Sequence, residues 1–169
     1  EALRSLIQPF VLRRLKTDTT VIKDLPEKTE MKVGYNLTPE QASLYAAVVE
    51  DMLSRIESSE GMKRRGQILA ALTKLKQICN HPAQFLKQTR PRLRGRSEKL
   101  DLLDELLATI LAEGGAALVF TQYVAMGRLL ERHLAASGIG HRFLHGQTSV
   151  AAREQMVREF QAGDVPVFV

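Results

Sequence analysis

The first half of the 169-residue chain spaces its apolar residues as long helices do. Residues 3–15 show this spacing, and residues 17–26 are typical of a connector. Residues 31–37 alternate apolar and polar side chains well enough to predict a short strand. Helical spacing resumes between 38 and 82 and is broken at 58–61, which predicts two further helices. The first half is therefore expected to be mainly helical.

The two helices between 38 and 82 have clear start and stop signals. Thr38 can cap the first helix, Pro39 suits its first helical position, and Gln41 completes a capping box. We expect the second helix to end at Asn80 in a left-handed cap, because Pro82 cannot continue it. The predicted inward faces are Leu44, Val48, Met52 and Ile56 in the first helix, and Ile68, Leu72, Leu75 and Cys79 in the second.

The second half alternates short apolar runs with amphipathic helices. A helix capped by Ser97 precedes a continuous apolar run at 116–120, as expected of a buried parallel strand. Two more strands are predicted at 141–145 and 165–169, each after a helix that ends in glycine. Connections of this length predict right-handed parallel crossovers. The predicted fold class is therefore α/β, a partial parallel sheet flanked by helices.

Polar residues follow two of the predicted strands. Thr121 and Gln122 follow the first, and Gly146, Gln147 and Thr148 follow the second. Parallel sheets place ligands beyond the carboxyl ends of their strands, and a helix that starts there presents free N–H groups to a phosphate. The pattern fits two adjacent sites that hold a nucleic-acid backbone, or ordinary turn and capping chemistry. Spacing alone favours turn chemistry.

Net charge is +5 and the isoelectric point is about 9.6, which favours nucleic acid or an acidic membrane surface as a partner. Residues 87–99 form a basic connector, in which Arg90, Arg92, Arg94 and Arg96 are the candidate phosphate contacts. A solvated loop explains these arginines equally well. Because Trp is absent and aromatic residues make up 5%, a stacking platform for single strands is not expected.

Several other kinds of site are excluded by the sequence. There is no Gly-Lys-Ser/Thr sequence, so these residues cannot cradle a nucleotide triphosphate as a Walker A loop does. Cys79 and His81 are too few ligands for a zinc site. Asp104 lies between leucines in a predicted helix, which indicates a solvated helix face rather than an ATPase carboxylate. A single cysteine excludes a disulfide within the chain and fits a reducing cytoplasm.

An ordered set of segments resembles the motifs of SWI2/SNF2 ATPases, and QICNHP is the most specific of them. The segments are PFVLRR at 9–14, DLPEK at 24–28, LTPEQ at 37–41 with Tyr45, QICNHP at 77–82, SEKLDLL at 97–103, LVFTQY at 118–123, and LHGQTS at 144–149 with Arg153 and Phe160. The chain departs from the family pattern at His145, where many members have Asp, and at Gln147, where Ser is common.

The resemblance implies a RecA-like fold with an inserted helical protrusion. Residues 1–26 would be the tail of lobe 1 and a linker. Residues 27–96 would be an edge strand, the protrusion and the basic connector. Residues 97–169 would be the first, incomplete part of RecA-like lobe 2. In this family lobe 2 contacts duplex DNA phosphates, which maps here onto Thr121, Gln122, Gly146, Gln147 and Thr148.

The resemblance also implies a function for the parent protein. It would be a DNA-dependent ATPase that uses ATP and Mg²⁺ to translocate on double-stranded DNA and remodel protein–DNA complexes. The segment itself would hold no catalytic, cofactor or metal site and would be inactive alone. Its expected partners are double-stranded DNA, the missing lobe 1 and, as further candidates, DNA-bound proteins, without a membrane. The expected location is cytoplasmic, at the nucleoid of a prokaryote, or nuclear in a eukaryote.

Two alternative functions remain open from the sequence. One is a non-catalytic module that binds DNA or protein on the same fold. The other is an RNA-directed helicase of superfamily 2, against which the QICNHP segment argues. Stimulation of ATP hydrolysis by duplex DNA or by RNA would separate them.

Overall fold

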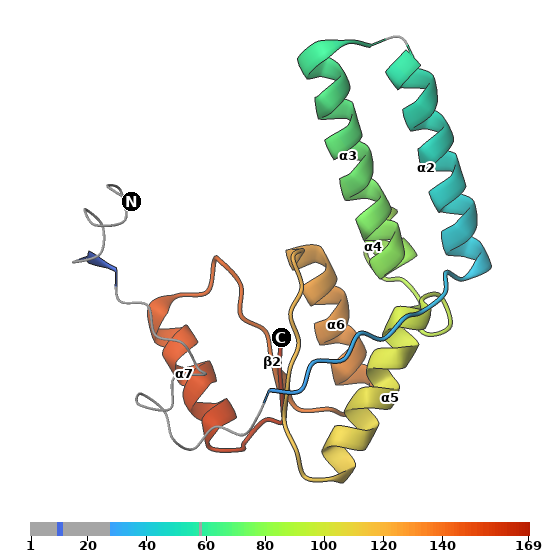
Figure 1. Cartoon of the computed structure of the whole chain (residues 1–169). Coiled ribbons are helices and arrows are strands. Elements are labelled where there is room, and N and C mark those ends of the chain that lie inside the picture. The colour runs from blue at the N-terminus through green and yellow to red at the C-terminus, as the bar shows by residue number, and fades with distance from the viewer. Residues whose placement is uncertain (1–9, 12–27, 58) are drawn as a thin grey trace. The chain divides into compact units, whose positions relative to one another are not determined.

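The computed structural model describes residues 10–11, 28–57 and 59–169. The chain divides into two compact units, Glu1–Gly34 and Tyr35–Val169. The helices and strands named below all belong to the second unit (Figure 1). The helix expected at 3–15, apart from Phe10 and Val11, and the connector expected at 17–26 lie outside the described residues.

Two long helices, α2 (Pro39–Glu57) and α3 (Gly61–Asn80), form a hairpin that projects from the rest of the second unit (Figure 1). The predicted capping box is confirmed: Thr38 N–H donates to Gln41 Oε1 at 3.1 Å, and Gln41 N–H donates to Thr38 Oγ1 at 3.3 Å. The hairpin has a small core of its own. It consists of Val48, Leu75 and Ile78, with Leu44, Val49 and Phe85 packed against it.

Two details predicted for α3 are wrong. Its buried positions are Ala71, Leu75 and Ile78, whereas Leu72 is 48% exposed. A two-helix hairpin buries only a narrow stripe, so part of an apolar helix face stays in water. The end of α3 has no left-handed cap at Asn80. Instead, His81 leaves the helix in an extended conformation, with φ −166° and ψ 135°.

The strand expected at 31–37 is absent. The side chains of Met31 and Val33 are 77% and 48% exposed, and the Asn36 N–H donates to the carboxylate of Glu98 at 2.8 Å instead of to another strand. Alternation of apolar residues describes a side-chain surface, but a strand forms only where a neighbouring edge supplies hydrogen bonds.

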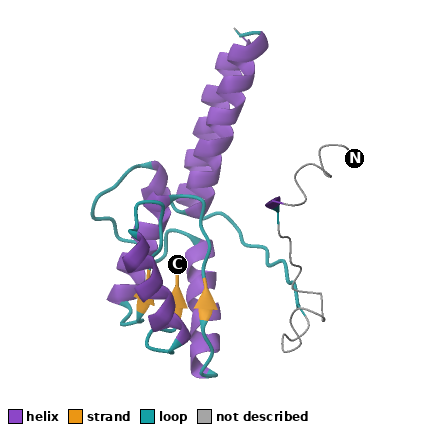
Figure 2. Cartoon of the chain, turned by 90° about the vertical axis from the view of Figure 1, so that its left-hand side faces the viewer, coloured by secondary structure: helices purple, strands orange, loops and turns teal. Residues whose placement is uncertain are grey.

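The remaining helices and strands form an α/β layer that starts with the short helix α4 (Pro82–Phe85). The others are α5 (Glu98–Ala112), β1 (Ala117–Leu118), α6 (Val124–Ala136), β2 (His141–Arg142), α7 (Val150–Gln161) and β3 (Val167–Phe168). The strands are parallel and lie in the order β1-β3-β2 (Figure 2). The predicted α/β class is therefore confirmed.

The strand order explains where the helices lie. The chain crosses from β1 past the position of β3 to β2, and then returns to β3 in the opposite direction. Because both crossovers are right-handed by preference, the reversal places α6 and α7 on opposite faces of the sheet (Figure 1). The main core lies on the side of α5 and α6. It includes Leu100, Leu107, Leu129, Leu130, Leu134 and Val167.

The other sheet face is only partly covered. No residue of α7 is fully buried, although the rings of Phe160 and Phe168 lie 5.5 Å apart. Leu118 is 57% exposed and Phe120 is 89% exposed. The prediction that the run 116–120 is buried throughout is therefore wrong, since α5 and α6 cover one side of β1 and α7 does not extend over the other.

Candidate nucleic-acid interface

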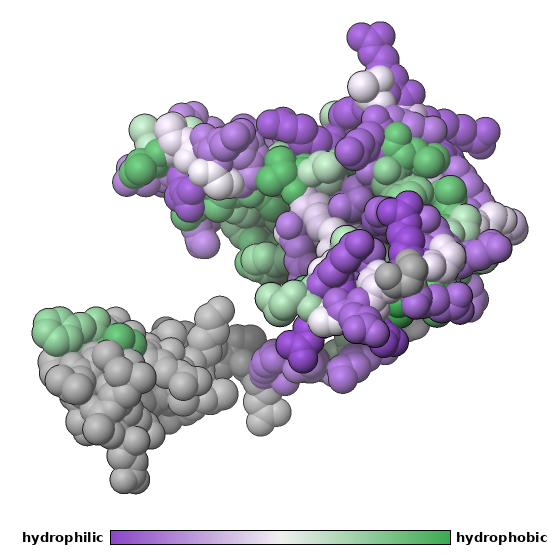
Figure 3. Space-filling model, turned by 90° about the horizontal axis from the view of Figure 1, so that it is seen from above, coloured by the Kyte–Doolittle hydropathy of each residue, from purple (hydrophilic) through white to green (hydrophobic). Residues whose placement is uncertain are grey.

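The segments after β1 and β2 lie at the same edge of the sheet, the edge to which all three strands point (Figure 2). They are not neighbours, because β3 lies between them. Two strand spacings separate β1 from β2 by about 10 Å, and the two segments lead to helices on opposite faces. The expectation of adjacent sites is corrected accordingly. The face of the described residues that is seen from above is mainly hydrophilic, with scattered apolar patches (Figure 3).

The segment after β1 lines a groove of about 330 Å³. We call it the α3–α6 groove, after α3 and the segment that leads into α6. Its described lining residues are Tyr35, Lys76, Cys79, Asn80, Lys99 and the four residues 120–123. The groove therefore brings together Thr121 and Gln122, both predicted site residues, with two lysines from α3 and α5.

The polar groups of the α3–α6 groove are held in place by local contacts. The Thr121 Oγ1 accepts a hydrogen bond from the Tyr123 N–H at 3.3 Å, so this hydroxyl shapes the turn and keeps its own proton for a ligand. Lys99 Nζ donates to Asn80 Oδ1 at 2.9 Å and lies 5.5 Å from the centre of the Tyr35 ring. These contacts fix one ammonium group at the groove wall.

The α3–α6 groove is positive. None of its described lining residues is an aspartate or a glutamate. Burial raises the pKa of the Cys79 thiol, although the positive charge of Lys99 opposes this. Burial also raises the pKa of Tyr35. Both groups are therefore neutral near pH 7, and the charges of Lys76 and Lys99 are not cancelled within the groove.

The segment after β2 is a compact turn. The Thr148 Oγ1 accepts from the His145 N–H at 3.1 Å, and the Gln147 N–H donates to His145 Nδ1 at 3.2 Å. Ser149 caps α7 by accepting from the Ala152 N–H at 3.3 Å. Gly146 has open space around it, so a ligand could approach its backbone. Turn chemistry accounts for the hydroxyls here, while Gly146 and Gln147 remain exposed.

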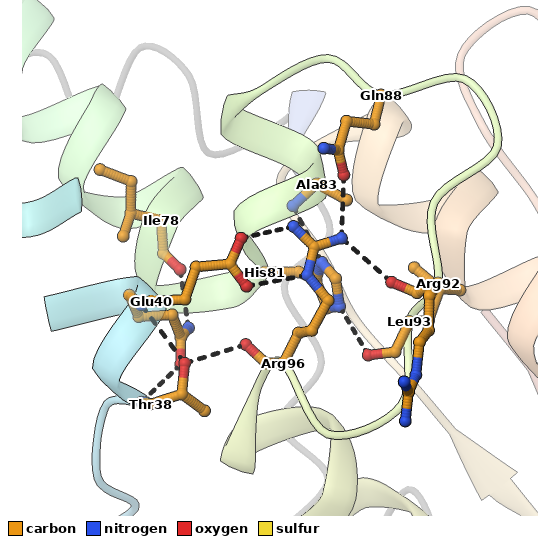
Figure 4. A network of polar contacts seen from close by, with 10 residues as sticks. Thr38, Glu40, Ile78, His81, Ala83, Gln88, Arg92, Leu93 and Arg96 are labelled. Carbon is orange, nitrogen blue, oxygen red and sulfur yellow. Dashed lines mark hydrogen bonds and ion pairs between the residues drawn. The ribbon is translucent and has the colours of Figure 1, made fainter. Parts of the chain in front are cut away.

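The four connector arginines differ in their surroundings. The Arg96 guanidinium binds both carboxylate oxygens of Glu40, at 2.8 and 2.6 Å, and also donates to Gln88 Oε1 and to the Arg92 carbonyl (Figure 4). This pairing lowers the pKa of Glu40, chiefly through the hydrogen bond from Arg96. Arg94 donates to Ser137 Oγ at 3.1 Å. Arg96 therefore has a structural role, which spacing alone did not indicate.

Arg90, Arg92 and Arg94 are all exposed, but only Arg94 among these three has a hydrogen bond from its guanidinium within the described residues. No hydrogen bond or ion pair of the Arg90 or Arg92 guanidinium is found within the described part of the chain. With Lys87 they line a shallow basic hollow of the connector. These two arginines stay candidates for contact with a polyanion.

The family-like motifs meet at the end of α3, where helix carbonyls need partners. Gln41 Nε2 donates to the Ile78 and Cys79 carbonyls, and the Ser97 hydroxyl donates to the Asn80 carbonyl at 2.7 Å. His81 is fully buried. Its Nδ1 accepts from the Ala83 N–H at 3.0 Å and its Nε2 lies 3.0 Å from the Leu93 carbonyl (Figure 4). The motifs thus join the hairpin to the α/β layer.

This geometry fixes the protonation of His81. Nε2 must carry the proton that the Leu93 carbonyl accepts, while Nδ1 must be unprotonated to accept from Ala83. The ring is therefore neutral. Burial lowers the pKa of His81 and outweighs the raising effect of the hydrogen bond to Leu93.

Sequence reasoning missed Tyr35, Lys76 and Asn80 as groove residues, and gave Lys99 only as part of the basic connector. Lys76 and Asn80 are one helical turn apart on α3, so helical spacing alone places them on one face. No sequence signal could show that this face meets the segment after β1. Asp104 was also misplaced: its Oδ1 lies 2.6 Å from Nε2 of the buried His133, so it joins α5 to α6.

Within residues 10–11, 28–57 and 59–169 there is no cluster of three or more His, Cys, Asp or Glu side chains suited to a metal ion. No helix among them has both the length and the apolar character needed to cross a bilayer.

Comparison with known sequences covers most of the chain. The profile of the SNF2-related domain matches residues 1–84, and that of the helicase conserved C-terminal domain matches residues 98–169. YwqA of Bacillus subtilis, which is named as an ATP-dependent helicase/translocase, is 43% identical over 99% of this chain and 18% of its own length. The DNA repair and recombination protein RAD26 of Saccharomyces cerevisiae is 32% identical over 99% of this chain and 16% of its own.

Solved structures give the same result. The Sulfolobus solfataricus SWI2/SNF2 ATPase core in complex with dsDNA superposes with a TM-score of 0.79 and 40% identity, over 99% of this chain and 36% of that one. The C-terminal domain of a Sulfolobus solfataricus SWI2/SNF2 ATPase gives a TM-score of 0.74 and 39% identity, over 79% of this chain and 59% of that one.

The fold and the groove define a RecA-like α/β lobe that carries a helical hairpin. The chain belongs to the SNF2 family of the helicase superfamily 2. Its relatives in that family are ATPases, chromatin remodellers and DNA repair proteins. The chain spans less than a fifth of the length of the first of these relatives.

Proposed function

We propose that the parent protein is an ATP-driven translocase on double-stranded DNA that remodels protein–DNA complexes, and that this chain supplies DNA-backbone contacts of its second lobe. The α3–α6 groove carries the proposal. It combines two lysines, a threonine hydroxyl and the Gln122 amide without an opposing carboxylate among its described lining residues.

The chemistry of the α3–α6 groove suits phosphate rather than bases. Ammonium, hydroxyl and amide groups all donate hydrogen bonds to phosphate oxygens, and such contacts set the position of a protein on a duplex without reading its sequence. Neutralising phosphates with lysines also releases counterions, so binding should weaken as salt rises. This fits a motor that has to move along DNA of any sequence.

The comparisons support the proposal by analogy. One superposing structure is described as an ATPase core in complex with dsDNA, and the Bacillus subtilis relative is named as a helicase/translocase. By the same analogy the parent uses ATP and Mg²⁺, while this segment alone binds neither and is inactive. We also propose the compartment that contains the DNA as its location.

The proposal is tested with the double variant Lys99→Gln and Thr121→Ala of the full-length protein. The duplex concentration that gives half-maximal ATPase stimulation should rise about tenfold, the equivalent of one charge-assisted contact of about 1.4 kcal/mol. Lys63→Gln is the matched control, because Lys63 is exposed on α3 outside the groove. An unchanged half-maximal concentration in the double variant would remove the groove from the DNA interface.

A second comparison identifies the nucleic acid. ATP hydrolysis by the full-length protein should be stimulated by duplex DNA and not by RNA of the same length. Equal stimulation by RNA would favour an RNA-directed helicase instead, and no stimulation by either would favour a non-catalytic binding module.

A further inference from the structure

A third concave site lies between α4, the connector and α6, and it shares Lys87, Gln88 and Thr89 with the basic hollow of the connector. It has a volume of about 370 Å³, and it shares no lining residue with the α3–α6 groove. We call it the α4–α6 cavity. This volume is at the small end of ligand-binding pockets, which range over roughly 300–1,000 Å³. None of the DNA contacts proposed above requires this cavity.

Apolar side chains form part of its lining. The exposed Ala125 lines the cavity together with Leu129 and Ala83, which are 7% and 1% exposed and so offer little surface there. Apolar atoms in a concave site gain free energy when an apolar group replaces water against them. A ligand that suits this cavity therefore brings an apolar group with it.

Three cationic side chains from two segments surround this apolar lining. They are Lys87 of the connector and Arg128 and Arg132 of α6. Arg132 donates to the Thr89 carbonyl at 2.5 Å, which fixes its position. Arg128 lies 3.6 Å from Glu131 and is 58% exposed, so this carboxylate offsets only part of the positive charge.

The backbone at Lys87 is unusual. Its φ is +51°, and it is the one non-glycine residue in this region of φ among the described residues. The Lys87 and Gln88 N–H groups close the end of α4 by donating to the Gln84 and Ala83 carbonyls. Glycine normally occupies this position, since a side chain there costs about 1 kcal/mol. Lys87 therefore places an ammonium group at a position where glycine would be less strained.

Gln84 supplies an unpaired donor beside the cavity. Its side chain lines the cavity and is only 5% exposed. The Oε1 accepts from Asn80 Nδ2 at 3.3 Å, but the Nε2 has no hydrogen-bond partner in the described protein. A buried unpaired amide costs about 1–3 kcal/mol. An acceptor that entered the cavity would relieve this cost after a small rotation of the Gln84 side chain.

We propose that the α4–α6 cavity binds an acidic peptide segment of a partner protein. One apolar side chain of the segment lies against Ala125 and the accessible edge of Leu129, and neighbouring carboxylates pair with Lys87 and Arg128. A backbone carbonyl of the segment accepts from Gln84. Duplex DNA fits less well, because its phosphates offer nothing apolar to cover the lining. This proposal does not depend on the proposed DNA contacts.

Fluorescence anisotropy of the full-length protein tests the proposal with a labelled twelve-residue peptide, in which a central leucine is flanked by glutamates. Two matched probes replace the glutamates with glutamine or the leucine with serine. We expect the parent peptide to bind at least about tenfold more tightly than either matched probe, a difference of about 1.4 kcal/mol. Equal binding of the three peptides would overturn the proposal.

The site is tested by the double variant Lys87→Gly and Arg128→Gln, which should weaken peptide binding about tenfold. Lys87→Gly alone should not lower the melting temperature, because glycine suits a φ of +51°. Arg65→Gln, an exposed charge removal on α3, is the matched control and should change nothing. Unchanged peptide affinity in the double variant would contradict the proposal, as would a loss of duplex DNA binding with the peptide unaffected.

Discussion

At the scale of single residues, one motif side chain and one connector side chain that the sequence offered as candidate ligands are instead structural. His81 donates to the Leu93 carbonyl of the connector and accepts from the Ala83 N–H of α4. Arg96 joins the connector to α2 through its ion pair with Glu40. A fully buried imidazole with both nitrogens in use leaves nothing for a metal. The QICNHP segment therefore stabilises the junction between the hairpin and the α/β layer, and it ends α3 where Lys76 and Asn80 line the groove.

His81 should make the stability of the protein depend on pH. Because burial lowers its pKa in the folded state, the unfolded chain binds a proton first as the pH falls below about 6.5. The contribution of neutral His81 is therefore complete above that pH and is lost below it. Urea unfolding at pH 8 and pH 5.5 should show a smaller free energy of unfolding at the lower pH.

The variant His81→Gln separates this effect from other titrations. At pH 8 it should lower the free energy of unfolding by about 2 kcal/mol, since the Ala83 N–H and the Leu93 carbonyl lose a well-placed partner. The loss should shrink at pH 5.5. A variant with the same pH dependence as the parent protein would show that His81 is not the titrating group.

At the scale of elements, α6 is held against the sheet and against α5 by specific contacts. A Cβ atom added at Gly127 would lie 2.2 Å from Cζ of Phe143, so only glycine lets α6 approach this ring so closely. On another side of the helix, His133 is 3% exposed and pairs with Asp104 of α5. Both contacts define the position of α6 and hence of the segment that begins the groove.

Gly127→Ala should therefore destabilise the protein although alanine is the better helix former. Overpacking against the buried Phe143 ring should lower the free energy of unfolding by about 2 kcal/mol. Gly66→Ala in α3 is the matched control, because nothing lies within 4 Å of its added Cβ. It should stabilise the protein by about 0.5–1 kcal/mol. Thermal unfolding of both variants checks the expectation, and a neutral Gly127→Ala would show that the ring can move away.

At the scale of the whole molecule, the net charge is +5, but not every cationic side chain is free to bind a phosphate. Arg96 pairs with Glu40 and the exposed Arg94 donates to Ser137, whereas the exposed guanidinium groups of Arg90 and Arg92 have no such contact among the described residues. A basic composition therefore overestimates the number of cations that can reach DNA. Of the predicted arginines, the tertiary structure leaves Arg90 and Arg92 as candidates, and it adds the two groove lysines.

Salt dependence measures how many of these cations reach phosphates. If Arg90 and Arg92 each neutralise one phosphate, replacing both with Gln should reduce the slope of log K against log salt by about 2. The pair Arg64→Gln and Arg65→Gln on α3 is the control and should leave the slope unchanged. An unaltered slope in the connector variant would mean that the connector is a solvated loop.

The sequence by itself determined the class of fold and the approximate ends of the long helices. Parallel α/β order follows from apolar runs that alternate with amphipathic helices, and the capping box at Thr38 and the cap at Ser97 are set by residues close in sequence. Such signals are local, because the atoms that satisfy a helix end lie within a few residues of it. The ordered motifs likewise identified the family.

Only the tertiary structure decided which side chains meet. The order β1-β3-β2 separates the two predicted sites, and the contacts that engage Arg96 and His81 join residues far apart in the chain. The absence of a strand at 31–37 has the same origin. Strand pairing, burial and ion pairing depend on distances between distant segments, and spacing along a sequence carries no information about those distances.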